Sequence, residues 1–88
     1  MSEAPWSLLF TARAKRDLRR LDPPIRVRTI AALQRLTEDP HSGKLSRLTG
    51  RPEFKLRVGE WRIIVELDHG ARTVVVHQAL PRGRAYDR

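Results

Sequence analysis

The sequence contains no cysteine, which excludes disulfide bonds, thiolate chemistry and cysteine-based zinc sites. Aromatic residues make up only 6% of the chain. No apolar run approaches the ~20 residues that a membrane-spanning helix needs. The first ten residues, MSEAPWSLLF, lack the basic start and the long apolar stretch of a signal peptide. We therefore expect a cytoplasmic protein without covalent cross-links.

Acidic residues are few relative to basic ones. The chain has 10 Asp and Glu against 18 Lys and Arg, so its net charge is +8, and 15 of the 18 basic residues are arginine. A small protein with this charge is expected to bind a polyanion. The planar guanidinium fork of arginine suits phosphate better than the ammonium of lysine does. The charge therefore favours nucleic acid, with an acidic protein or an anionic membrane surface as alternatives.

The 88 residues are 40% apolar and contain no repeat, low-complexity tract or long linker. We expect one globular domain over residues 1–88. A chain of this size buries only about 60–65% of its unfolded surface, so the core is expected to be small.

The N-terminal part has the pattern of a strand followed by a helix. Trp6, Leu8 and Phe10 alternate with other residues, as in a short strand with one buried face. Thr11 is a favourable N-cap and predicts a helix over residues 12–21. The apolar stripe of this helix consists of Ala14, Leu18 and Leu21.

A second helix is predicted over residues 24–38. Asp22 is its expected cap, and Pro23 fits the first helical position, where a missing N–H costs nothing. Asp39-Pro40 ends it, because the residue before a proline avoids the α region. Its apolar side chains are Val27, Ile30, Ala31, Leu33 and Leu36. The two helices are expected to form an antiparallel hairpin.

The C-terminal half is predicted to be a sheet. Residues 40–52 resemble a connection, and strands are expected at about 53–58, 61–67 and 72–79. The predicted order is β-α-α-β-β-β. This order indicates an α+β fold in which two N-terminal helices pack on a small antiparallel sheet.

The stretch FKLRVGEWRIIVE, residues 54–66, predicts a hairpin with an unusual charge pattern. A two-residue turn at Gly59-Glu60 sets the register and brings Arg57 opposite Arg62. One face is predicted to meet the helices and carries Phe54, Leu56, Val58, Trp61, Ile63 and Val65. The other face carries Lys55, Arg57, Arg62, Ile64 and Glu66. Like charges directly opposite each other destabilise a sheet. A phosphate-binding site explains this concentration of cations better than a solvated outer face does.

The register of the last two strands is predicted with Leu67 opposite Arg72. This pairing places His77 opposite Arg62 on the basic face, whereas a one-residue bulge would move His77 to the other face. The spacing of the three histidines, at 41, 69 and 77, matches no familiar metal-ligand pattern, and no carboxylate cluster predicts Mg²⁺. We expect no metal and no cofactor.

The chain resembles the RelE/ParE superfamily of bacterial toxins from toxin–antitoxin pairs over nearly its full length. The stretches that carry the resemblance are TARAKRDLRRLD, LTEDPHSGKLSRLTG, FKLRVGEWRIIVELD and RGRAY. The resemblance implies two N-terminal helices on a small antiparallel sheet. For RelE-like members it implies a metal-independent mRNA endoribonuclease that acts in the ribosomal A site. In these enzymes the 2′-hydroxyl attacks the adjacent phosphate.

The resemblance also assigns roles to individual residues. The implied catalytic residues are Lys55, Arg62, Arg82 and Tyr86. The implied substrate-binding residues are Arg57 and Arg84, and we add His77 from the predicted register. The chain departs from the pattern at Glu53, where some RelE-like members have a further lysine.

Two other functions remain open at this point. A ParE-like toxin would bind and inhibit DNA gyrase without cleaving nucleic acid, on the same fold. A plain RNA-binding domain is less consistent with the sequence, since the basic face lacks aromatic residues for base stacking. As a toxin, this +8 chain is expected to bind an acidic antitoxin in a hetero-oligomer, in addition to the ribosome and mRNA.

Overall fold

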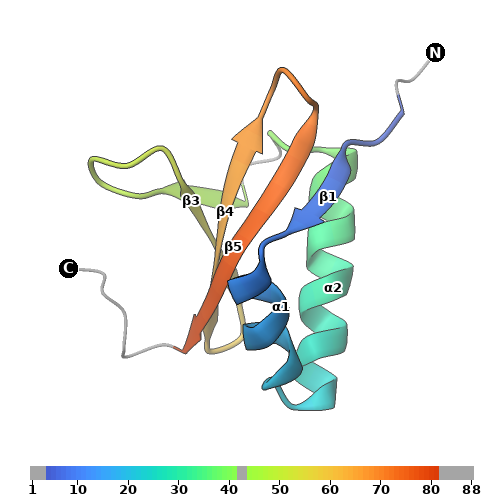
Figure 1. Cartoon of the computed structure of the whole chain (residues 1–88), viewed down its shortest axis with the longest axis vertical. Coiled ribbons are helices and arrows are strands. Elements are labelled where there is room, and N and C mark those ends of the chain that lie inside the picture. Colours follow the sequence, from blue (N-terminus) through green and yellow to red (C-terminus); the bar gives the residue numbers. More distant parts are fainter. Residues whose placement is uncertain (1–3, 42–43, 82–88) are drawn as a thin grey trace.

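The computed structural model describes residues 4–41 and 44–81 (Figure 1). The elements are β1 Ser7–Phe10, α1 Ala12–Arg19, α2 Pro23–Glu38, β2 Leu45–Arg47, β3 Phe54–Val58, β4 Trp61–Asp68 and β5 Thr73–Pro81. Figure 1 shows both helices on one side of the sheet. The predicted α+β class with two helices packed on a sheet is confirmed.

The sheet has five strands in the order β1-β5-β4-β3-β2. β1 runs parallel to β5, and all other neighbours are antiparallel. The sheet is therefore mixed rather than wholly antiparallel. Strand β2 lies inside the predicted connection, where Leu45 pairs with Leu56 and Arg47 with Phe54. A strand of three residues is too short for its alternation to be recognised in the sequence.

Helix α1 begins as predicted and also covers part of the sheet edge. The Thr11 hydroxyl accepts a hydrogen bond from the Ala14 amide at 3.1 Å and donates to the His77 carbonyl at 3.0 Å. Further along the helix, the Oδ2 atom of Asp17 accepts a hydrogen bond from the Ala79 amide at 3.0 Å. β1 pairs with β5 only as far as Val76. Beyond Val76, the side chains of Thr11 and Asp17 accept or donate the hydrogen bonds along this edge of β5.

Helix α2 has the predicted ends but a different buried face. Pro23 takes the first helical position and Asp39 follows the last, while the Asp22 side chain makes no capping bond. Thr29 is fully buried, whereas Val27, which was expected on the apolar face, is 68% exposed. The helix is therefore rotated about its axis, so that the face it packs against the core differs from the one that hydropathy alone indicated.

The core lies between the helices and the inner face of the sheet. Its buried members are Ala14, Leu33, Leu36, Leu56, Val58, Ile63, Val65, Val74, Val76 and Ala79. Each fully buried Ile or Val contributes about 1.5–3 kcal/mol relative to an exposed one. The inner face predicted for the β3–β4 hairpin is confirmed, since its partly buried members Phe54 and Trp61 also pack against this core.

The turn between β3 and β4 fixes their register. Gly59 has a positive φ of 58°, and Glu60 does not, as in a type II′ turn with glycine at its first position. Val58 pairs with Trp61 and Arg57 with Arg62, which confirms the predicted pairing.

Candidate nucleic-acid interface

The outer face of the β3–β4 hairpin, opposite the helices, carries three cationic side chains. Lys55 and Arg57 alternate with the buried Leu56, and Arg62 precedes the buried Ile63, so all three point away from the core. Arg57 and Arg62 are direct partners in the ladder. Their Cβ atoms are therefore about 4.5–5.5 Å apart. We call Lys55, Arg57 and Arg62 the cationic cluster.

An apolar residue lies beside the cationic cluster. Ile64 is the ladder partner of Lys55 and is only 4% exposed, although it lies on the outer face. Lys55 and Arg62 are partly buried, while Arg57 is exposed. Lys55 is diagonal to Arg62, and such residues are about 7–8 Å apart, with their Cβ atoms somewhat closer. The three cations can therefore surround a single phosphate group.

His77 lies on the same face but not where the sequence placed it. A bulge in β5 lies between the pairs Ile64–Gln78 and Val65–Val76, which leaves His77 without a ladder partner. Arg62 lies opposite Leu80, so the predicted pairing of Arg62 with His77 is wrong. The register from Leu67 is also wrong, because Leu67 pairs with Val74 rather than Arg72.

The His77 side chain has a specific partner that the sequence did not reveal. Its Nε2 atom is 2.9 Å from the Glu66 Oε1 atom, and the two side chains are 32% and 44% exposed. The Glu66 carboxylate orients the imidazole. The hydrogen-bonded pair of His77 and Glu66 therefore lies on the face that carries the cationic cluster.

The remaining site residues from the sequence, Arg82, Arg84 and Tyr86, lie outside the described residues. The last described residues, Leu80 and Pro81, lie opposite Arg62 and Trp61.

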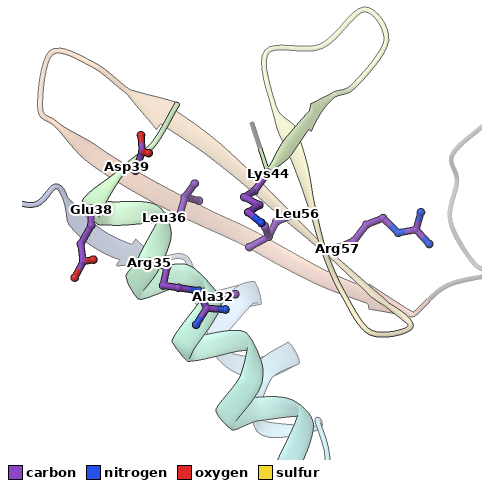
Figure 2. Close-up of a pocket in the computed structure, with 8 residues that line it drawn as sticks. All are labelled: Ala32, Arg35, Leu36, Glu38, Asp39, Lys44, Leu56 and Arg57. Atoms are coloured by element: carbon purple, nitrogen blue, oxygen red, sulfur yellow. The ribbon is translucent and has the colours of Figure 1, made fainter. Parts of the chain in front are cut away.

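A groove between α2 and β3 is a second feature that the sequence did not indicate. One cavity of about 430 Å³ is lined by Ala32, Arg35, Leu36, Glu38, Asp39, Lys44, Leu56 and Arg57 (Figure 2). A neighbouring hollow of about 260 Å³ shares Ala32, Arg35 and Arg57 with it, so the two form one continuous groove. In Figure 2 the Arg57 side chain extends away from α2, while Lys44 and Leu56 lie close together beside the helix.

The groove has a largely cationic rim, to which Glu38 and Asp39 add two acidic side chains. Arg28 and Arg35 line it from α2, and Lys44 and Arg57 line it from the opposite side. In the described part of the chain, β2 pairs with β3 only at residues 54–56. No sequence signal pointed to this groove, because it depends on how closely α2 packs against the sheet.

Comparison with known proteins identifies the family. A family model described as the ParE toxin of the type II toxin–antitoxin system, parDE, matches residues 8–86. This match covers most of the chain. The chain belongs to the RelE/ParE superfamily of toxins. The resemblance found in the sequence is thereby confirmed, and the protein is a toxin of a toxin–antitoxin system.

Solved structures of RelE/ParE toxins have the same fold. The toxin–antitoxin complex RelBE2 from Mycobacterium tuberculosis matches with 31% identity and a TM-score of 0.75, over 90% of this chain and 100% of that one. The archaeal RelE–RelB complex from Pyrococcus horikoshii matches with 18% identity and a TM-score of 0.80, over 93% and 100%. The RelBE complex from E. coli matches with 24% identity and a TM-score of 0.77, over 90% and 99%. No curated protein matches the chain by sequence.

These RelE/ParE structures are complexes of a toxin with its antitoxin, which supports an antitoxin partner for this chain.

Within residues 4–41 and 44–81, no helix is long and apolar enough to cross a membrane.

Proposed function

We propose that this toxin is a ribosome-dependent mRNA endoribonuclease. The observation that carries the proposal is the direct opposition of Arg57 and Arg62, with Lys55 diagonal to the pair. A sheet tolerates opposed cations at a cost in stability. An anionic substrate that lies across the pair is attracted by both guanidinium groups, and mRNA supplies a phosphate at each nucleotide.

The reaction is transesterification within the mRNA chain. The 2′-oxygen forms a bond to the adjacent phosphorus while the bond from phosphorus to the 5′-oxygen of the next nucleotide breaks. A base accepts the 2′-hydroxyl proton and an acid protonates the departing 5′-oxygen. The products are a 2′,3′-cyclic phosphate and a free 5′-hydroxyl. The intermediate phosphorane carries extra negative charge, so cations held at its equatorial oxygens lower the barrier.

Each described residue has a role that fits its place. Arg62 stabilises the phosphorane, and Arg57 holds a substrate phosphate from the exposed side of the face. Lys55 is a candidate for the group that accepts the 2′ proton. His77 contacts the substrate, and its bond to Glu66 fixes its orientation. For the residues outside the described ranges, we propose that Arg82 and Tyr86 act at the leaving oxygen and that Arg84 binds substrate.

A second candidate function is supported by the family model. The model that matches residues 8–86 describes ParE toxins. A ParE-like toxin would inhibit DNA gyrase by binding, and the same cationic cluster would then serve as a binding surface rather than as a catalytic one.

A paired assay separates the two functions. The purified toxin is added to a translation extract and the ends of the mRNA are mapped, and the same preparation is added to a gyrase supercoiling assay. Cuts at fixed positions within codons, absent when ribosomes are omitted, support the endoribonuclease. Intact mRNA together with inhibited supercoiling would refute it and establish the ParE-like function.

The groove between α2 and β3 supports an assignment for the antitoxin. We propose that an acidic antitoxin segment occupies it, because the rim is largely cationic. Co-expression with the neighbouring open reading frame tests the partnership. Failure to recover a stable complex on co-purification would contradict it.

A further inference from the structure

Two histidines from distant segments meet at the end of the molecule that carries the β4–β5 loop. His41 follows helix α2, and His69 lies in the loop between β4 and β5. Their Nε2 atoms are 3.3 Å apart. The ring planes lie within 14° of each other, with centroids 5.2 Å apart. Since the nitrogens are much closer than the centroids, the two rings approach each other through their Nε2 edges.

An aromatic ring contacts both imidazoles. Trp6 presents its ring edge-on to His69 at 5.2 Å and to His41 at 6.2 Å, both with an interplanar angle of 88°. The guanidinium of Arg72 lies 5.8 Å from the Trp6 ring centroid and donates to the Ala4 carbonyl at 2.9 Å. Both imidazoles are exposed, and the Trp6 ring packs against each of them.

A hollow of about 350 Å³ adjoins the pair and is lined by Pro40, His41, Leu45, Arg47, Phe54, Leu67 and His69. Its volume accommodates an ion with several waters, since one water needs only about 30 Å³ of liquid volume. The Arg47 guanidinium lies over the Phe54 ring at 5.2 Å, so this cation is held against an aromatic face.

We propose that His41 and His69 form a two-ligand site for a borderline divalent transition metal such as Zn²⁺. Zinc–nitrogen bonds of about 2.0–2.1 Å in a tetrahedral site place two ligand nitrogens roughly 3.3–3.4 Å apart. The observed separation of the Nε2 atoms is 3.3 Å. Imidazole favours zinc, copper and nickel over magnesium and calcium, which prefer oxygen ligands.

The chemistry of binding follows from the two rings. Each imidazole must offer its Nε2 lone pair, so the ring that donates a proton in the present contact transfers it to Nδ1 or releases it. Among the described residues, no group of three or more His, Cys, Asp or Glu could hold a metal ion. Water therefore completes the coordination, and the ion exchanges readily. The bound ion joins the end of α2 to the β4–β5 loop.

The test uses tag-free protein, because a polyhistidine tag would itself bind zinc. ZnCl₂ is titrated by calorimetry, and the thermal unfolding midpoint is followed in parallel. We expect one ion per chain. At free zinc of about five times Kd, the midpoint should rise by about 4–8 °C. Magnesium at the same concentration should leave the midpoint unchanged.

Three matched variants locate the ion. His41→Gln and His69→Gln should each abolish both the heat of binding and the rise in midpoint. His77→Gln should retain both, because the remaining histidine is bonded to Glu66 elsewhere on the sheet. Absence of saturable binding would overturn the proposal and leave a simple N–H···N hydrogen bond. Binding that survives His41→Gln, or a stoichiometry of half an ion per chain, would also overturn it.

A spectroscopic readout reports the site directly. In a Trp61→Phe background, Trp6 is the single tryptophan. Cu²⁺ bound by the two imidazoles would lie next to this ring and quench its fluorescence with a saturable profile. Adding His69→Gln should remove the saturable quenching, and circular dichroism establishes that each variant remains folded. Equal quenching with and without His69 would contradict the site.

Discussion

Arg57 on β3 and Arg62 on β4 are direct partners in an antiparallel ladder, so two guanidinium groups leave the same face side by side. The two-residue turn at Gly59-Glu60 leaves the chain no other register. Two guanidinium groups this close together favour the binding of an anionic partner. The same two residues therefore connect the stability of the hairpin with its proposed activity.

Removal of Arg62 should abolish activity without unfolding the protein. Arg62→Ala deletes the cation proposed to stabilise the phosphorane, and loss of one such group lowers the rate by about 10²–10³-fold. Growth arrest on induction and cleavage in a translation extract measure the effect. Arg16→Ala, an exposed arginine on α1, is the control and should remain toxic. If Arg62→Ala still arrests growth at equal expression, the proposed site is wrong.

Replacement of Arg57 should separate stability from binding. Arg57→Thr removes the like-charge opposition and adds a β-branched residue, so the free energy of unfolding should rise by about 0.2–1 kcal/mol. RNA binding should weaken. The plot of the logarithm of the association constant against the logarithm of the salt concentration should become less steep by about 0.7, as expected for one lost phosphate contact. Denaturant unfolding and binding titrations at several salt concentrations test both parts. Lower stability together with an unchanged salt slope would contradict them.

The β3–β4 hairpin was fully predictable from the sequence because all its determinants are local. The alternation from Phe54 to Val65 assigns the faces, and the two-residue turn assigns the register. The β5 register was not predictable, because the bulge at His77 depends on a distant residue. The His77 carbonyl accepts a hydrogen bond from the Thr11 hydroxyl, 66 positions away.

The buried face of α2 shows a similar limit. Hydropathy placed Val27 on the inner face, yet Val27 is 68% exposed and Thr29 is fully buried. The rotation of a helix about its axis depends on how it packs against the sheet and α1, which a single-helix pattern does not contain. The groove along α2 depends on the same packing, so neither its rim nor its volume could be predicted.

The Asp17 carboxylate should matter more to stability than its ion pair suggests. Its Oδ2 atom accepts one hydrogen bond from the Ala79 amide at 3.0 Å and another from the Arg13 Nε atom at 3.3 Å. Asp17→Ala leaves a buried backbone amide without a partner, which should lower the free energy of unfolding by about 1–3 kcal/mol. Arg13→Ala removes only the exposed partner, so its effect should stay below about 1 kcal/mol. Equal losses in the two variants, measured by denaturant unfolding, would show that the ion pair dominates.

The buried hydroxyl of Thr29 should be replaceable with a gain in stability. Its Oγ1 atom is buried and has no hydrogen-bond partner within residues 4–41 and 44–81. Thr29→Val keeps the shape and removes an unsatisfied polar group, so the free energy of unfolding should rise by about 1–2 kcal/mol. Thr37→Val is the matched control. The Thr37 hydroxyl donates to the Gln34 carbonyl at 2.6 Å, so this variant should lose about 0.5–1.5 kcal/mol. A destabilised Thr29→Val protein would contradict the prediction.

Charge reversal on the groove rim should weaken the antitoxin complex. Arg35 lines both parts of the groove, whereas Arg16 is an exposed arginine on α1 that lines none of the described cavities. Arg35→Glu and Arg16→Glu change the net charge equally, so any difference between them reports position. We expect Arg35→Glu to weaken binding roughly three- to tenfold at low salt, mainly through slower association, because rim charges steer encounter. The difference should shrink at high salt, where exposed charges are screened. Equal effects of the two variants in kinetic binding measurements would place the antitoxin elsewhere.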